Sequence, residues 1–210
     1  GDPIRLLTDE DLPEGNYTGV RLRFDPDDTD NAFVIDGIGS ERTLSIEDGE
    51  YADIDFNVAE DESSSESLTL TLDLRLSLSA NEQDEYHLAP VLRSIPTDQA
   101  GAIQGIVTAA CLSEDLGENA PAVYLFEGQD VTADDFDDGQ DVEPFATAPV
   151  LLTTDQFTYE LRFIPEGSYT IALACNGAEE DPTTDEDLDF QATQNIELDE
   201  GETLQQDLTI

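Results

Sequence analysis

Apolar residues recur at every second position along most of this 210-residue chain, and this period constrains the fold more than any other feature. The clearest stretch covers residues 68–78, where six leucines alternate with threonine, aspartate, arginine and serine. A period of two places the leucines on one face of a β-strand and the polar residues on the other. We therefore expect one long, half-buried strand over residues 68–78.

Similar stretches, separated by turn residues such as Asp36-Gly37 and Asp48-Gly49, predict strands along the rest of the chain. Strands at this spacing are typical of antiparallel sandwiches. We expect them at residues 18–24, 33–35, 43–46, 52–58 and 87–95, and again at 102–111, 122–126, 150–153, 157–163, 168–174, 189–198 and 203–210.

The segment Pro96-Thr97-Asp98-Gln99-Ala100-Gly101 interrupts the alternation, and we place a domain boundary there. The prediction is an all-β chain of two tandem antiparallel β-sandwich domains, Ig-like or transthyretin-like, over residues 1–98 and 99–210. We call these the first half and the second half. No apolar stretch approaches the ~20 residues of a membrane-spanning helix, so we expect no membrane span.

The charge is extreme, because 51 acidic residues face seven arginines and no lysine, which leaves a net charge of −44. The first half carries 25 acids and six arginines, and the second carries 26 acids and one arginine, so both folded surfaces are acidic. Such a chain repels nucleic acid and anionic membranes. In ~1 M salt the Debye length falls to roughly 3 Å, so the charge points to a salty or calcium-rich exterior.

Two cysteines, Cys111 and Cys175, each end a predicted strand. A disulfide between them would close a loop of about 65 residues and contribute roughly 4 kcal/mol on the chain-entropy model. The alternative is a pair of buried free thiols. We expect the disulfide, because the other features indicate a secreted protein in an oxidising compartment.

The second half resembles the carboxypeptidase-regulatory-like, transthyretin-like sandwich family. The resemblance rests on Gly105-Ile106-Val107, on Phe157-Thr158-Tyr159-Glu160-Leu161, on Ile164-Pro165-Glu166-Gly167-Ser168-Tyr169 and on a final hairpin at residues 196–203. In that family a Pro-x-Gly-x-Tyr turn precedes a core strand. The family is a non-catalytic accessory fold, so the resemblance implies no catalytic residues.

The first half resembles an uncharacterised domain common in bacterial surface lipoproteins, through Leu12-Pro13-Glu14-Gly15-Asn16-Tyr17 and the stretch 70–92. Proteins of that type carry a further strand before this turn, so the resemblance implies a sandwich without its opening strand. A missing strand leaves a groove that another chain can fill by β-strand addition. The candidate donors are residues 203–210 and 2–7, although we favour 203–210 as the last strand of its own domain.

Acidic loops provide the candidate metal ligands, since calcium takes six to eight oxygens from such loops. Two loops, at residues 25–30 and 134–141, are rich in aspartate, but neither has the full EF-hand spacing. A third, more diffuse cluster runs from Glu179 and Glu180 to Asp189. The alternative is a hydrated acidic surface suited to high salt. The candidate ligands are Asp25, Asp27, Asp28 and Asp30 in one loop and Asp134, Asp135, Asp137, Asp138 and Asp141 in the other.

Signals for catalysis are weak. His87 is the single histidine, and no Gly-x-Ser-x-Gly elbow accompanies it. We therefore expect His87 to be structural and the protein not to be an enzyme. Asn16 begins the one Asn-x-Thr sequon and is a candidate glycosylation site.

Together these features predict a secreted, non-enzymatic structural subunit of a bacterial surface or extracellular fibre, whose partners are copies of itself. It would assemble head-to-tail by strand complementation or domain docking, with no required cofactor. The first alternative is a monomeric module that binds calcium or a glycan. A third reading is an accessory domain pair cut from a larger enzyme.

Overall fold

The computed structural model describes residues 4–6, 12–21, 32–46, 51–58, 67–81, 83, 85–113, 120–136 and 142–210, with only the backbone for residues 51–55. This part of the chain is nearly all β, with one short 3₁₀ turn, η2 (Gly177–Glu179). The predicted all-β class is therefore confirmed. Among the residues described, no helix is long and apolar enough to cross a membrane.

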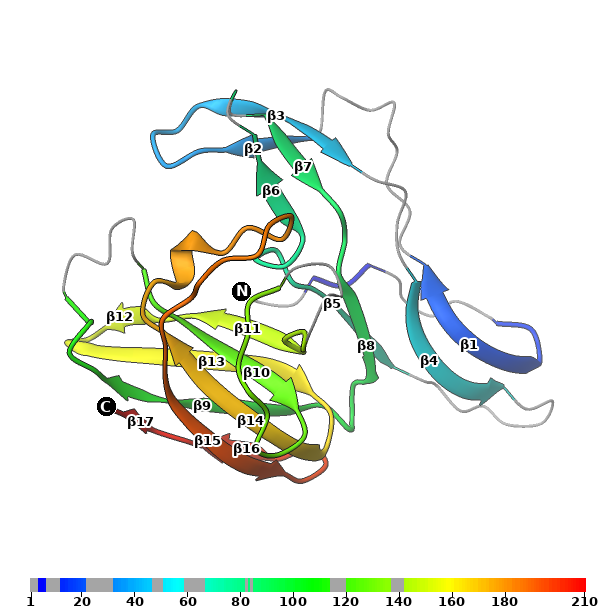
Figure 1. Ribbon diagram of the computed structural model, residues 1–210. Helices are drawn as coiled ribbons and strands as arrows, with labels where there is room; N and C mark the ends of the chain where they lie inside the picture. The colour runs from blue at the N-terminus through cyan, green and yellow to red at the C-terminus, as the bar shows by residue number, and fades with distance from the viewer. Residues whose placement is uncertain are drawn as a thin grey trace.

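The second half forms two facing sheets (Figure 1). All pairings are antiparallel except those of the last two strands, which run parallel to β9. The first sheet has the strand order β11 (Ala146–Pro149), β10 (Ala122–Glu127), β14 (Gly167–Ala174), β15 (Phe190–Leu198). The second sheet has the order β12 (Leu151–Thr153), β13 (Gln156–Ile164), β9 (Gly101–Thr108), β16 (Thr203–Gln205). The last strand, β17 (Leu208–Thr209), also pairs with β9.

The main core lies between these two sheets, where Ile103, Leu125 and Ile171 are fully buried. The sheet that contains β10 is covered on its outer face too, because Tyr124 and Phe126 form a second buried cluster. Every residue from Ala122 to Phe126 is consequently buried. Burial on both faces explains why β10 is a continuous apolar run rather than an alternating one.

The chain crosses from one sheet to the other on both sides of this sandwich. It passes from β11 to β12 through Val150 on one side and from β15 to β16 through residues 199–202 on the other. On that second side, Gln206 Nε2 donates to Gln194 Oε1 at 2.7 Å. The predicted disulfide is confirmed, since Cys111 and Cys175 are bonded with their Cα atoms 5.9 Å apart, and it links the β9 end of one sheet to the β14 end of the other.

Residues 203–210 are a strand of their own domain, as favoured above. They form β16 and β17 beside β9, and Leu208 is fully buried in the main core. This pairing favours the role as the last strand of its own domain over the donor role considered for the segment. Between the two strands, Asp207 accepts a hydrogen bond from the Ile106 amide at 2.9 Å.

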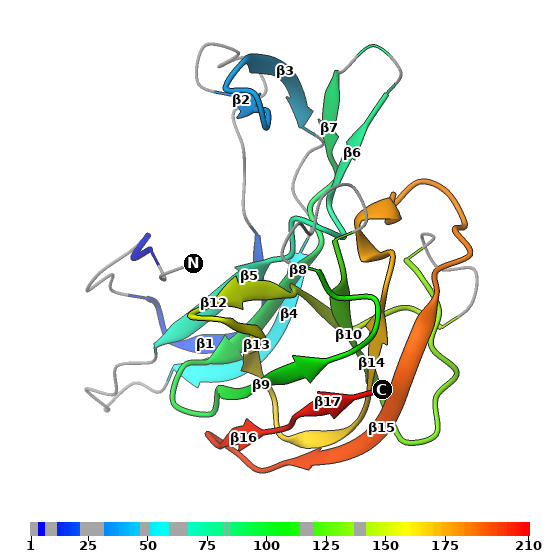
Figure 2. The ribbon, with the colours of Figure 1, turned by 90° about the vertical axis from the view of Figure 1, so that its left-hand side faces the viewer.

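The first half is arranged differently. Strand β4 (Tyr51–Val58) lies beside β8 (Leu92–Pro96), and β3 (Glu41–Ile46) runs parallel to β7 (Tyr86–Leu88). Figures 1 and 2 show the four-stranded sheet of this half projecting away from the sandwich of the second half. The pairs are β1 (Gly15–Arg21) with β4 (Tyr51–Val58) and β5 (Leu68–Leu72) with β8 (Leu92–Pro96), and the four-stranded order is β2 (Phe33–Ile35), β3 (Glu41–Ile46), β7 (Tyr86–Leu88), β6 (Leu78–Ala80).

Burial differs sharply between the halves. Both clusters of buried apolar residues among the described positions belong to the second half. In the described ranges of the first half the buried apolar side chains are Leu76, Leu88 and Ile95, whereas Ile35 is 63% and Ile38 84% exposed. Among the described residues the first half therefore buries fewer apolar side chains than the second half, where Val142, Leu151, Leu152 and Ile210 are the large apolar residues left exposed.

A tyrosine corner opens a strand in each half. The Tyr17 hydroxyl donates to the Pro13 carbonyl at 2.8 Å, and the Tyr169 hydroxyl donates to the Pro165 carbonyl at 2.9 Å. In both cases the acceptor lies four residues earlier, in a Pro-Glu-Gly-x-Tyr turn. The same hydrogen bond fixes strand entry in immunoglobulin-like sandwiches.

Three expectations about strands need correction. The predicted strand 68–78 is interrupted, because β5 ends at Leu72, residues 73–77 turn, and β6 begins at Leu78. The predicted strand 87–95 is also divided, into β7 and β8. Strand β11 was not predicted, because Ala-Thr-Ala-Pro carries little apolar signal. Residues 22–24 of the first predicted strand lie outside the described residues.

We expect Gly105→Ala to destabilise the second half, because its Cβ would lie 1.9 Å from the Gln206 carbonyl oxygen. The strand that packs against Gly105 would have to move, and overpacking of this kind costs about 2–3 kcal/mol. Denaturant unfolding in molar salt measures the change. Gly37→Ala is the matched control, since nothing lies within 4 Å of its Cβ position. Equal stability of the two variants would contradict the prediction.

Candidate functional site

The turn that interrupts the leucine-rich stretch is the place where the two halves meet. The Asp73 carboxylate is nearly buried and accepts hydrogen bonds from the Thr147 amide at 3.0 Å and the Thr147 hydroxyl at 3.1 Å. It also accepts from the Arg75 amide at 3.1 Å. Within the turn, Ser77 Oγ donates to the Asp73 carbonyl at 2.5 Å. The strand breaks because a carboxylate turns toward β11 of the second half.

Two of the seven arginines reach across the same junction. The Arg75 guanidinium donates to the Tyr124 hydroxyl at 3.0 Å and to the Gly177 carbonyl, and it lies 5.8 Å from the centre of the Tyr124 ring. Arg93 lies 4.8 Å from the centre of the Phe145 ring. Burial lowers the pKa of the Arg93 guanidinium, and the nearby Asp73 carboxylate opposes that shift. The junction is thus a buried contact between charges and aromatic rings.

Gly177 makes this contact sterically possible. A Cβ at this position would lie 2.7 Å from the Ala122 backbone nitrogen and 2.6 Å from the Ala122 side chain. Only glycine lets the chain pass this close to β10 and present its carbonyl to Arg75. The conformation of the 3₁₀ turn η2 therefore depends on one residue without a side chain.

A carboxylate cluster continues from the junction into the second half. The Tyr124 hydroxyl, which accepts from Arg75, donates to Glu180 Oε2 at 2.7 Å. Oxygens of Glu180, Asp135 and Glu186 lie within 4.8 Å of one another. Asp135 is 3% exposed, and its Oδ2 accepts from the Glu186 amide at 2.5 Å. Arg75 is therefore connected to these carboxylates through one hydroxyl.

Burial changes the protonation of one member of this cluster, Glu180. Burial raises the pKa of Glu180 to about 7, and the Asp135 charge acts in the same direction. Hydrogen bonds from Tyr124 and the Phe136 amide lower this pKa, as does Arg75, but they do not offset burial. Burial also raises the pKa of Tyr124, which keeps its hydroxyl protonated and able to donate. Near neutral pH, a proton or a bound cation relieves the repulsion among the three carboxylates.

The structure combines two of the acidic segments that the sequence indicated separately. Asp135 comes from the predicted loop, and Glu180 and Glu186 come from the diffuse third cluster, with Glu186 51 residues beyond Asp135. Asp134 accepts a hydrogen bond from the Asp135 amide at 3.2 Å. Calcium binding here stays a prediction. The remaining candidates, Asp25, Asp27, Asp28, Asp30, Asp137, Asp138 and Asp141, lie outside the described residues.

His87 is half-buried and Asn16 is exposed, each on a strand of the first half. Ser45 Oγ lies 2.9 Å from His87 Nδ1, and the two residues face each other across the β3–β7 pair. The contact is that of cross-strand neighbours, which supports the structural role expected for His87. Asn16 Oδ1 accepts from Asn57 Nδ2 at 2.7 Å. Glycosylation of Asn16 and the absence of catalysis stay predictions.

Comparison with known proteins adds a domain match for the first half. Residues 1–90 match a domain of unknown function, DUF4382. No curated protein matches the chain. A crystal structure described as that of a putative cell adhesion protein from Bacteroides fragilis NCTC 9343 aligns with 99% of this chain and 82% of its own, at 10% identity and a TM-score of 0.27. A similarity this low carries no argument. The resemblance of the second half to the carboxypeptidase-regulatory-like family stays a prediction.

Removing the Asp73 carboxylate should weaken the junction. In Asp73→Ala the partly buried amide and hydroxyl of Thr147 lose their acceptor, which costs about 1–3 kcal/mol of unfolding free energy. Denaturant unfolding measures this loss, and the Thr147 amide should exchange with solvent faster. Asp98→Ala, in the exposed turn between the halves, is the control and should change stability little. If the two variants behave alike, Asp73 does not hold the halves together.

The raised pKa of Glu180 predicts how stability varies with pH. The folded state binds this proton more tightly than the unfolded state, so the contribution is full below about pH 4.5 and is lost as the pH rises through about 7. Glu180→Gln should remove this decline, because the amide imitates the protonated acid. Thermal unfolding between pH 5 and pH 8 with a chelator present measures it, and Glu179→Gln is the exposed control. An unchanged decline in Glu180→Gln would exclude Glu180 as the titrating group.

Proposed function

We propose that this chain is a non-enzymatic structural subunit of a bacterial cell-surface or extracellular fibre, joined head-to-tail through its first half. The observation that supports this most is the difference in burial between the halves. Both buried apolar clusters among the described residues belong to the second half, and more of the exposed large apolar side chains belong to the first half than to the second. Such an asymmetry suits a contact in which different surfaces of successive copies meet.

The edge strand β2 illustrates the open surface. Within the part of the chain that the structure describes, it pairs with β3 on one side and stands at the end of its sheet. Phe33 and Ile35 are 42% and 63% exposed, and they lie on the same face because they are two residues apart. Free apolar edges of this kind pair with strands of other chains. The buried junction at Asp73 would then transmit force from the first half to the second.

The disulfide and the charge support an extracellular or cell-surface location. Disulfides such as Cys111–Cys175 persist in oxidising, extracytoplasmic compartments. Copies that each carry a charge of −44 repel one another unless the charge is screened. Molar salt, with a Debye length of roughly 3 Å, would allow the apolar contacts to form. Assembly should therefore depend on salt.

Electron microscopy and sedimentation of the full chain test this proposal. In molar salt we expect head-to-tail polymers, which shorten or disperse as the salt is removed. Ile35→Glu should prevent polymer formation, because it places a further carboxylate on the open edge. Val142→Glu, at a residue 45% exposed in the second half, is the matched control and should still assemble. Dispersed wild-type monomers at every salt concentration would contradict the proposal.

A calcium-binding monomer is the second candidate function, and the approach of Asp135, Glu180 and Glu186 to within 4.8 Å favours it. If it holds, calorimetric titration of the wild type with calcium should release or absorb heat, and Asp135→Asn should weaken the binding at least tenfold. Asp98→Asn, with the same change of charge on an exposed turn, should bind like the wild type. No heat with the wild type would remove this candidate.

A further inference from the structure

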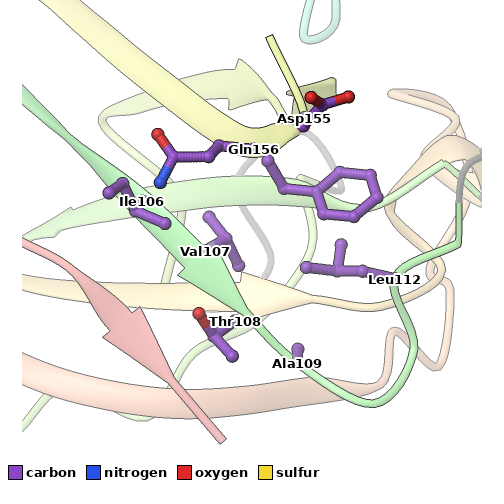
Figure 3. A pocket seen from close by; sticks show the side chains of 8 residues that line it. Ile106, Val107, Thr108, Ala109, Leu112, Asp155 and Gln156 are labelled. Carbon is purple, nitrogen blue, oxygen red and sulfur yellow. The ribbon is translucent and has the colours of Figure 1, made fainter. Parts of the chain in front are cut away.

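A small groove opens at one end of the second half (Figure 3). It lies between the end of β9, the loop that follows β9, and the turn that joins β12 to β13. Its volume is about 290 Å³. Val107, Leu112 and Phe157 line it with apolar atoms, and Thr108, Asp155 and Gln156 lie around them.

The chemistry of the groove suits aliphatic side chains better than a cofactor. Its volume is at the lower end of the range for small-molecule sites, which is roughly 300–1,000 Å³. Phe157 and Leu112 pack against the main core, so the groove extends the core to the surface. Beside it, Thr154 and Asp155 have φ angles of 47° and 69°, which identify the two-residue turn as a tight hairpin turn. That turn places the Asp155 carboxylate next to an apolar cavity.

The described residues include a segment with the complementary chemistry. Ile4 and Leu6 are 84% and 65% exposed and belong to no strand. Residues 3–8 read Pro-Ile-Arg-Leu-Leu-Thr and contain one arginine and no acid. Asp2 and Asp9 flank this stretch, but within it a copy presents one positive charge and no negative charge to its neighbour. Arg5 also offers a cation to a surface that carries the Asp155 carboxylate.

We propose that the groove receives the segment Ile4–Leu6 of a second copy, with an aliphatic side chain in the cavity and the Arg5 guanidinium near Asp155. This inference rests on the proposed head-to-tail assembly and adds a second contact to that of the β2 edge. The groove belongs to the second half and the segment to the first, so each copy offers both. A contact between two different surfaces repeats without closing when the rotation does not form a ring, and it generates a filament.

Cross-linking between two variants, each with one cysteine added to the native Cys111–Cys175 pair, tests the proposal. Full-length Leu6→Cys is mixed with full-length Gln156→Cys in molar salt under mild oxidation, and the products are separated without reductant. We expect a reducible dimer that joins residues 6 and 156, identified by mass spectrometry. Glu200→Cys, on an exposed turn elsewhere in the second half, replaces Gln156→Cys as the control and should give at least tenfold less dimer.

A second variant tests the charge. Arg5→Glu in the Leu6→Cys copy should slow cross-linking several-fold at low salt and less at high salt, because the attraction to Asp155 becomes repulsion. If light scattering shows polymers but the dimer does not exceed the control, the groove proposal is wrong and the assembly proposal stands. If no polymers form and no dimer appears, both are wrong.

Discussion

The Asp73 carboxylate, turned out of its strand toward Thr147, is the contact on which the arrangement of the two halves depends. An ion buried without partners costs several kcal/mol, so its position has to be matched on the other side. Thr147 supplies two donors to Asp73, and Arg75 reaches Tyr124 and Gly177 beside it. A chain with seven cations therefore uses two of them, Arg75 and Arg93, to hold its halves together rather than to neutralise its surface.

The period of two predicted most strands, because one face of each is buried and the other is solvated. It failed where a residue leaves the alternation for a distant partner. Leucines at 74 and 76 continue the pattern, yet Leu74 is 56% exposed and Leu76 is buried, since Asp73 bonds to a residue 74 positions away. No local pattern contains that partner. Strand β11 was not predicted because its residues show little apolar alternation, and its strand conformation depends on pairing with β10.

The candidate site was predictable in composition but not in geometry. The sequence marked both the loop at residues 134–141 and the cluster around Glu180 as acidic. Only the topology, which brings the two segments together over the outer face of β10, shows that Asp135, Glu180 and Glu186 converge. Their link to Arg75 through the Tyr124 hydroxyl could not be foreseen, because tyrosine in a buried strand reads as core. The three carboxylates of the second half are thereby connected to Arg75, which belongs to the junction between the halves.

Amide hydrogen exchange of the dilute, unassembled chain tests the central claim most directly. If the first half is docked through its turn and open elsewhere, the amides of Asp73, Ser77, Val91 and Thr147 should be protected from exchange nearly as well as those of β10. The amides of β2 and β3 should exchange at least tenfold faster. Exchange at the turn as rapid as in β2, or protection of the whole first half equal to that of β10, would contradict the account.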